Sequence, residues 1–294
     1  MTDTTELFGN SLVEHGPGND RACLLRLHPD DAAGMVDTLE ELALSQGYSK
    51  VCVRIPSWET ARFVRGGYHL EAAIPRFYAE GGSYCFMAKY LSQERKAERQ
   101  PLLVREVLVA ADAQQRSAVT KLPPSCALRL ALADDADQMA LLYRAVFSDR
   151  PTPLHDPARI RCAMGEGSLF FGVWQEKSLV ALARASVDSA SYSAELGDFA
   201  TLPEFRSRGL AQHLVQQTEG YLHPMGIRSL FALTGAYSFA MNLTLARNGY
   251  HFGGTLTNDN NSYGQLESVN LWHKLLQEDP GLAWSFLYRE GPGW

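Results

Sequence analysis

The turn at residues 206–211 constrains the fold of this chain more than any other feature. Residues 193–202 (SAELGDFATL) have the character of a strand, and residues 209–226 have the spacing of an amphipathic helix that ends at Pro224 and Gly226. Between them stands the segment RSRGLA. A strand that passes through a glycine turn directly into a helix is typical of α/β folds.

The pattern around this turn continues on both sides. The expected elements are, in order, a strand at 126–133, a helix at 134–147, a short helix near 160, a β-hairpin at 168–188, the strand and helix named above, a strand at 229–235, a helix at 238–249 and two final strands. This order, β-α-α-β-β-β-α-β-α-β-β, predicts a mixed α/β (α+β) sheet in a domain that spans residues 126–294.

The first part of the chain predicts a smaller α/β lobe. Its expected elements are a strand at 23–27, a helix at 30–47, a strand at 50–56, a helix at 57–67 and two strands at 68–78 and 83–91. A densely charged segment then continues into a helix, and consecutive prolines at 123 and 124 stop it. We therefore expect an N-terminal lobe at 1–125, with a charged helical linker at 92–125, and a domain boundary before Cys126.

The two parts of the chain share a short repeat. The N-terminal part contains RGGYH at 65–69 and the C-terminal part contains RNGYH at 247–251, each between a predicted helix and a predicted strand. A glycine–aromatic pair is a common helix stop, because glycine tolerates the left-handed cap. The matching context favours a degenerate duplication.

Composition excludes several classes of function. The net charge of −6 argues against general nucleic-acid binding. The five cysteines show no CxxC or Cys/His spacing, so they predict no metal site and indicate reduced thiols in a cytoplasmic protein. The N-terminus does not resemble a signal peptide, and no apolar run approaches the ~20 residues that span a membrane. No HExxH, Walker-type or Gly-x-Ser-x-Gly motif occurs.

The turn at 206–211 has the properties of an anion site. Free N–H groups at a helix N-terminus and the helix dipole both favour negative charge. Gly209 lets the backbone approach a phosphate closely, and the small Ala211 leaves room beside the first turn. With a strand before it and a helix after it, the segment predicts a cradle for a pyrophosphate.

These residues resemble the GNAT family of acetyl-CoA-dependent N-acetyltransferases. The family motif (Arg/Gln)-x-x-Gly-x-(Gly/Ala) stands here as Arg206-Ser-Arg-Gly-Leu-Ala211, within a resemblance that covers residues 126 to about 276. The segments AELGDFATLPEFRSRGL, AMNLTLARNGYHFGGTLTN and ESVNLWHK are similar to the β-lysine N6-acetyltransferase branch, as are GYHLEAAIPRFY and YCFMAKY in the first lobe. The resemblance implies a GNAT fold at 126–294, preceded by a degenerate GNAT-like lobe.

The resemblance implies which residues hold acetyl-CoA, the co-substrate. Backbone groups of the turn would bind the pyrophosphate, the end of the preceding strand would pair with the pantetheine arm and orient the thioester, and Asn242 is a further candidate for that arm. The residues are Arg206, Ser207, Arg208, Gly209, Leu210 and Ala211 in the turn, Phe199, Ala200 and Thr201 on the strand, and Asn242 on the helix after it. The first lobe lacks this motif, so we expect it not to bind the coenzyme.

Two carboxylates are candidates for the catalytic base. A lysine-type ammonium has a pKa near ~10.4, so a base must remove its proton before it attacks a thioester. Glu195 and Asp198 lie three residues apart on the strand, so alternation places them on opposite faces unless a bulge intervenes. The resemblance favours Glu195, while Asp198 is nearer the thioester. Leu245 stands where many family members have a tyrosine acid.

The acceptor implied by the resemblance is the terminal amine of β-lysine, and the product is N6-acetyl-β-lysine, a compatible solute. Candidates for its carboxylate are Arg76 and Tyr78 in the first lobe or Arg150 in the proline-rich loop, and candidates for its second amine are Asp156 and Glu267. Alternatives are another amine, such as lysine, a polyamine or a protein lysine, and a weakly catalytic acyl-CoA-binding module. We expect a small-molecule partner and a homodimer, without nucleic acid or membrane.

Overall fold

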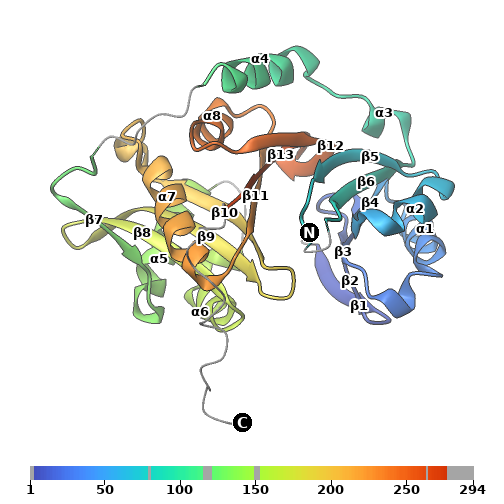
Figure 1. Cartoon of the computed structure of the whole chain (residues 1–294), viewed down its shortest axis with the longest axis horizontal. Helices are drawn as coiled ribbons and strands as arrows, with labels where there is room; N and C mark the ends of the chain where they lie inside the picture. Colours follow the sequence, from blue (N-terminus) through green and yellow to red (C-terminus); the bar gives the residue numbers. More distant parts are fainter. Residues whose placement is uncertain (1–2, 79–80, 115–120, 149–152, 263, 277–294) are drawn as a thin grey trace, which may run out of the picture.

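The computed structural model describes residues 3–78, 81–114, 121–148, 153–262 and 264–276. Within these residues the strands join in one mixed sheet of 13 strands, in the order β1-β2-β3-β4-β6-β5-β12-β13-β11-β10-β9-β8-β7. Two groups of helices cover this sheet, one in each lobe (Figure 1). The predicted mixed α/β class is confirmed.

The N-terminal lobe contains six of these strands. Its elements are β1 (Thr4–Phe8), β2 (Ser11–Gly16), β3 (Arg21–Arg26), the 3₁₀ turn η1 (Pro29–Asp31), α1 (Met35–Gln46), β4 (Lys50–Pro56), η2 (Ser57–Glu59), α2 (Thr60–Arg65), β5 (His69–Ile74) and β6 (Tyr84–Tyr90). The sequence reading missed the hairpin β1–β2, because β1 is an exposed edge strand of polar composition. The predicted helix at 30–47 begins only at Met35, after η1, and it ends at Gly47, as predicted.

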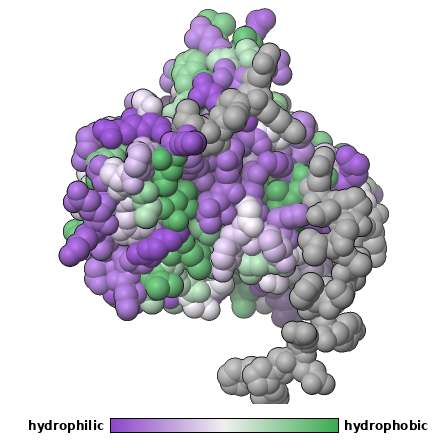
Figure 2. All heavy atoms as spheres, turned by 60° about the vertical axis from the view of Figure 1, so that its left-hand side comes forward, coloured by the Kyte–Doolittle hydropathy of each residue, from purple (hydrophilic) through white to green (hydrophobic). Residues whose placement is uncertain are grey.

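The connection between the lobes contains α3 (Gln93–Lys96) and α4 (Pro101–Asp112), which crosses the top of the molecule (Figure 1). Ala111 of α4 packs in the same apolar cluster as Leu245 of the C-terminal lobe. Leu102 and Val109 of α4 are exposed, with exposed fractions of 74% and 62%. Figure 2 shows hydrophobic residues among hydrophilic ones at the top of the surface. The helix is shorter than predicted, and residues 115–120 lie outside the described residues.

The C-terminal lobe has the predicted order of elements. They are β7 (Cys126–Leu130), η3 (Ala133–Asp135), α5 (Ala136–Val146), η4 (Pro153–His155), α6 (Pro157–Gly165), β8 (Ser168–Gln175), β9 (Ser178–Asp188), β10 (Ser193–Thr201), η5 (Pro203–Phe205), α7 (Leu210–Leu222), η6 (His223–Met225), β11 (Ser229–Gly235), α8 (Phe239–Arg247), β12 (His251–Ser262) and β13 (Gln265–Leu275). Phe170 packs with α5 and α6, whereas its neighbour Phe171 packs with α7. These helices therefore cover opposite faces of the sheet.

The two lobes repeat one topology. In each lobe one parallel pair stands at the centre: residues 21–24 of β3 pair with 50–53 of β4, and residues 193–196 of β10 pair with 229–232 of β11. From the junction β5–β12 outward, the strand order of one lobe matches that of the other, with β7 as an addition. The tyrosines of the two RxGYH repeats, Tyr68 and Tyr250, are both buried in these positions. This topology supports the duplication inferred from the repeats.

The lobes meet where β5 pairs antiparallel with β12, through Ala72 and Gly254. These two residues are equivalent in the repeat, since each lies four positions after its tyrosine. A Cβ at Gly254 would lie 2.2 Å from the carbonyl oxygen of Glu71, and its φ is +137°. Only glycine permits this approach of the two strands.

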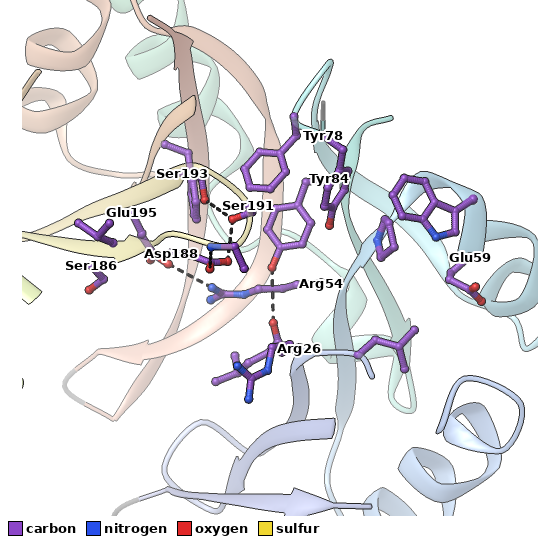
Figure 3. Close-up of a pocket in the computed structure, with 18 of the residues that line it drawn as sticks. Arg26, Arg54, Glu59, Tyr78, Tyr84, Ser186, Asp188, Ser191, Ser193 and Glu195 are labelled. Carbon is purple, nitrogen blue, oxygen red and sulfur yellow. Dashed lines mark hydrogen bonds and ion pairs between the residues drawn. The ribbon is translucent and has the colours of Figure 1, made fainter. Parts of the chain in front are cut away.

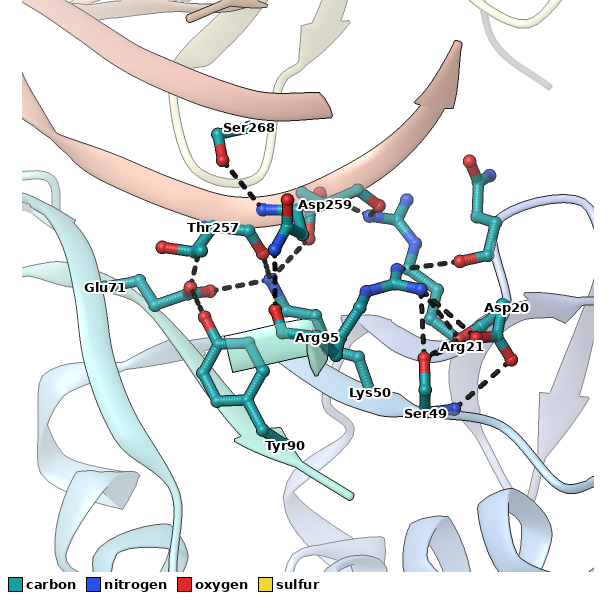
Figure 4. A network of polar contacts seen from close by, with 12 residues as sticks. Asp20, Arg21, Ser49, Lys50, Glu71, Tyr90, Arg95, Thr257, Asp259 and Ser268 are labelled. Atoms are coloured by element: carbon teal, nitrogen blue, oxygen red, sulfur yellow. Dashed lines mark hydrogen bonds and ion pairs between the residues drawn. The ribbon is translucent and has the colours of Figure 1, made fainter. Parts of the chain in front are cut away.

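Buried ion pairs connect β12 to the N-terminal lobe (Figure 4). Asp259 accepts hydrogen bonds from Arg21 and, at 3.0 Å, from Lys50, whose ammonium also lies 3.0 Å from Glu71. All these side chains are buried. Burial raises the pKa of Asp259, but the two cations lower it by more, so the pKa of this carboxyl lies well below its ordinary value. Ion pairs therefore join the two lobes in addition to the strand pairing of β5 with β12.

Candidate active site

The strands β10 and β11 diverge at the centre of the C-terminal lobe. Their parallel pairing ends at Leu196 and Ala232, after which β10 continues beside β9 and β11 beside β13. The register of β10 with β9 shifts at a bulge between Gly197 and Ala200. The end of β10 before the turn is therefore splayed away from β11.

The turn that follows has the backbone geometry of an anion site. Ser207 and Gly209 have φ values of +61° and +74°, and Gly209 caps the N-terminus of α7. Within the described part of the chain, the N–H groups of residues 207–211 have no backbone acceptor. Successive free N–H groups at a helix start form a concave nest for an anion.

The two arginines of the turn contribute to its shape and its charge. Arg206 donates from Nε to the carbonyl of Thr201 at 3.3 Å, and Arg208 donates to the carbonyl of Glu204 at 2.8 Å. Both side chains are exposed, so their charge faces solvent beside the nest. Leu210 is buried and Ala211 half-buried. The residues present fit the pyrophosphate of coenzyme A.

The structure gives Asn242 a role inside the fold. Its side chain is fully buried and donates to the carbonyls of Gly235 and Ser238 at 3.0 and 2.6 Å. Its oxygen accepts from Asn270 at 2.9 Å and from Trp272 at 2.8 Å. These four bonds use the whole hydrogen-bonding capacity of the amide, which leaves none for a pantetheine arm.

Glu195 lines a cavity of about 530 Å³ between the two lobes (Figure 3). One wall is aromatic, with Phe77 and Tyr84 of the N-terminal lobe stacked at 4.7 Å and Phe231 of β11 6.3 Å from Phe77. Phe231 is also the ladder partner of Glu195, so the cavity reaches the parallel pairs just before the splay. The size is typical of a small-molecule site.

Arg54, from β4 of the N-terminal lobe, pairs with Glu195 across this cavity. Its Nη1 lies 3.3 Å from Oε2 of Glu195, and the exposed fraction of its side chain is 18%. Burial lowers the pKa of the Arg54 guanidinium, but the charge of Glu195, together with weaker neighbours, raises it by more, so this pKa lies above its ordinary value. Arg54 therefore stays charged. No motif in the sequence pointed to Arg54.

The bulge places Asp198 on the same face of the sheet as Glu195, because it shifts the alternation after Gly197. Asp198 has a φ of +50°, and its carboxylate lies 2.7 Å from Nε of Arg184 on β9. The buried hydroxyl of Tyr143 on α5 is near, and burial, followed by the charge of Asp198, raises the pKa of Tyr143. Of the two candidate carboxylates, Glu195 lines the cavity and Asp198 does not.

The substrate candidates are not brought together. Tyr78 lines the cavity, and burial raises its pKa. Among the described residues, Arg76, Asp156 and Glu267 lie outside the cavity lining. Asp156 instead caps α6 by accepting from Ala158 at 2.9 Å. Arg150 lies outside the described residues.

The cavity contains polar residues that the sequence reading missed. Besides Arg54, these are Arg26, Glu59, Asp188, Ser191 and Ser193. None of these residues belongs to a motif. For the segments of the first lobe that contain them, the sequence predicted secondary structure and no site. The repeat relates β3 and β4 to β10 and β11, but it does not indicate which of their side chains line the cavity.

In the described ranges, no group of three or more metal-ligating side chains occurs, and no helix is long and apolar enough to cross a membrane.

Comparisons with known proteins agree with this geometry. Residues 136–250 match the acetyltransferase (GNAT) family. The N-acetyltransferase YodP of Bacillus subtilis is 32% identical over 199 residues, which cover 68% of this chain and 72% of that protein. The chain belongs to the GNAT family of acetyltransferases, which use acetyl-CoA.

Two further relatives match both lobes. The β-lysine N6-acetyltransferase of Methanococcus maripaludis is 26% identical over 268 residues, covering 91% of this chain and 97% of that protein. The protein of that name from Methanosarcina mazei is 27% identical over 260 residues, covering 81% and 95%.

Proposed function

We propose that this enzyme transfers the acetyl group of acetyl-CoA to the terminal amine of β-lysine. The product, N6-acetyl-β-lysine, has one ammonium and one carboxylate, so its net charge is zero, as suits a compatible solute. Support for this substrate comes from the two relatives that carry it in their names, because the similarity extends over the N-terminal lobe as well.

One observation carries the proposal: Glu195 faces a cavity built by both lobes, next to the splay of β10 and β11. An amine in this cavity would lie between the carboxylate and the open strand ends. The aromatic wall suits the methylene chain of the substrate, and the charged residues suit its ends. A cavity of this size with one wall formed by the N-terminal lobe also favours a small molecule over a lysine in a protein.

The proposed chemistry balances with the residues present. Glu195 takes a proton from the ammonium, directly or through water, and the neutral nitrogen attacks the thioester carbonyl. A C–N bond forms, the C–S bond breaks and coenzyme A leaves as the thiolate, which takes the second proton that the nitrogen loses on becoming an amide. The backbone N–H groups at the bulge between Gly197 and Ala200 are our candidates to stabilise the negative charge on the carbonyl oxygen. Leu245 is buried, so α8 offers no tyrosine acid there.

We assign the coenzyme to the C-terminal domain, residues 126–294, and the acceptor cavity to both lobes. Residues 199–201 and 206–211 would hold the pantetheine arm and the pyrophosphate, respectively, through their backbone. The N-terminal lobe, residues 1–125, has the same central strands but no Arg-x-x-Gly-x-Ala turn. In this proposal the N-terminal lobe forms one wall of the acceptor cavity.

The proposal is tested by thiol release from acetyl-CoA with β-lysine, lysine and spermidine side by side. We expect kcat/KM for β-lysine to exceed the others by ~100-fold, or about 2.7 kcal/mol of transition-state discrimination. Equal turnover of the three amines would contradict β-lysine as the substrate. Coenzyme binding without turnover of any amine would indicate an acyl-CoA-binding module instead.

A further inference from the structure

Two charged side chains of the cavity have no ionic partner in the described structure. Five charged residues line it: Arg26, Arg54, Glu59, Asp188 and Glu195. Arg54 pairs with Glu195 at 3.3 Å, and Glu59 pairs with Arg62 of α2 at 3.2 Å. Among the described residues, no ion pair involves Arg26 or Asp188. One guanidinium and one carboxylate are therefore available to a ligand.

Arg26 ends β3 in the N-terminal lobe, just after the pairing of β3 with β4 stops at Leu24 and Val53. This is the counterpart of the position where β10 leaves β11. The divergence opens the cavity on this side, and Leu25, Arg26 and Leu27 line it. In the N-terminal lobe the splay therefore forms part of the acceptor cavity.

Asp188 ends β9 on the opposite lobe, and its carboxylate is held in place by its own turn. It accepts from the N–H of Ala190 at 3.0 Å and from the hydroxyl of Ser191 at 2.6 Å. These bonds fix the carboxylate without neutralising its charge. Figure 3 shows Asp188 on the lobe of Glu195, and Arg26 on the opposite lobe.

We propose that Arg26 and Asp188 form a subsite for the amino-acid end of the acceptor, with Arg26 binding its carboxylate and Asp188 its second ammonium. This rests on the proposed function, since Glu195 then receives the reacting amine. Both residues are exposed at the cavity. A cation and an anion without ionic partners in one cavity match the two charges of a zwitterionic group. Arg54 is excluded as the carboxylate ligand because it already pairs with Glu195. The acceptor class is therefore a diamino acid, not a polyamine.

The test compares substrates that lack one group each. β-Lysine carries both groups, 1,4-diaminopentane lacks the carboxylate, and 6-aminohexanoate lacks the second amine. Arg26→Gln should raise KM for β-lysine and for 6-aminohexanoate by about 10- to 100-fold, the usual effect of a charged hydrogen bond, and should change KM for the diamine far less. Asp188→Asn should raise KM for β-lysine and for the diamine but not for 6-aminohexanoate. Arg105→Gln, at an exposed position on α4, is the matched control and should change none.

Equal effects of Arg26→Gln on substrates with and without a carboxylate would overturn the subsite. Lysine and cadaverine also differ only by a carboxylate. Measurements with this pair distinguish failure of the subsite from failure of the proposed function. If lysine is acetylated in place of β-lysine and Arg26→Gln weakens lysine but not cadaverine, β-lysine is wrong as the substrate and the subsite stands. If the unmodified enzyme acetylates the diamines as well as the amino acids, the subsite is wrong.

Discussion

At the scale of single residues, Glu195 and Asp198 show how environment separates two similar side chains. Both are half-buried on one strand, and both pair with an arginine. Glu195 lines the cavity beside an arginine of the other lobe, while Asp198 lies against β9 and α5. Position relative to the cavity, and not the type of side chain, distinguishes them.

We expect Glu195→Gln to lower kcat by ~10²- to 10⁴-fold, because the amide cannot accept the proton of the amine. KM for acetyl-CoA should change little, since the turn at 206–211 is unaltered. Steady-state kinetics at saturating amine measure this effect, with Asp198→Asn as the matched variant. A larger loss of kcat in Asp198→Asn than in Glu195→Gln would assign the base to Asp198.

His273 on β13 gives a second prediction at this scale. It is buried, with an exposed fraction of 8%, and its Nδ1 has no hydrogen-bond partner in the described structure. Burial, and then the nearby His251, lowers the pKa of His273 to about 4, from an ordinary value of 6.5. The folded state therefore binds fewer protons than the unfolded state between these values, and stability falls as the pH falls from 6.5 to 4.

This group should cost the enzyme about 2 kcal/mol of unfolding free energy between pH 7 and pH 4.5. His273→Gln should remove that part of the pH dependence, as measured by urea unfolding at the two pH values. His69→Gln, at an exposed position, is the control. An unchanged difference between the two pH values in His273→Gln would contradict the prediction.

At the scale of elements, the bulge and the turn of β10–α7 act as one unit. The register of β10 shifts at the bulge between Gly197 and Ala200, and Ser207 and Gly209 in the turn have left-handed backbone conformations. Each feature is local in sequence. In the proposed function they would position two parts of one coenzyme.

Gly209→Ala should raise KM for acetyl-CoA by about 10-fold, because a Cβ disfavours φ of +74° by ~1 kcal/mol and the turn would relax away from its nest. KM for the amine should be unaffected. Gly226→Ala is a matched control at the other end of α7. Its φ is +83° and no atom lies near its Cβ position, so it carries the strain without the nest. Equal KM values in the two variants would argue against the nest.

At the scale of the molecule, the cavity exists only because two lobes meet in a fixed orientation. The strand pair β5–β12 and the buried network around Asp259 set that orientation. The cavity and the Arg54–Glu195 pair both cross the interface. Stability of the junction and activity should therefore be coupled.

Asp259→Asn should lower the unfolding free energy by ~3–5 kcal/mol, because Arg21 and Lys50 would remain buried without their common anion. Urea unfolding measures the change, and Asp134→Asn, at an exposed position, is the control. A loss below 1 kcal/mol would show that the network contributes little to the junction.

The sequence by itself determined what depends on neighbouring residues. Strand 193–201, the turn at 206–211 and helix 210–222 follow from periodicity, glycine and capping, so the order of elements in the C-terminal lobe could be predicted. The RxGYH repeats likewise indicated the duplication, because a helix stop is a local signal.

Only the tertiary structure decided what depends on contacts between distant residues. Arg54 and Glu195 are 141 positions apart, and Arg21 and Asp259 are 238 apart. No local pattern could show that Arg26 lines the cavity of Glu195, or that the side-chain amide of Asn242 forms its hydrogen bonds inside the core. The physical reason is that these side chains obtain their roles from the meeting of two lobes. That meeting depends on a strand pairing at Gly254 and on buried charges, and neither has a signature along the chain.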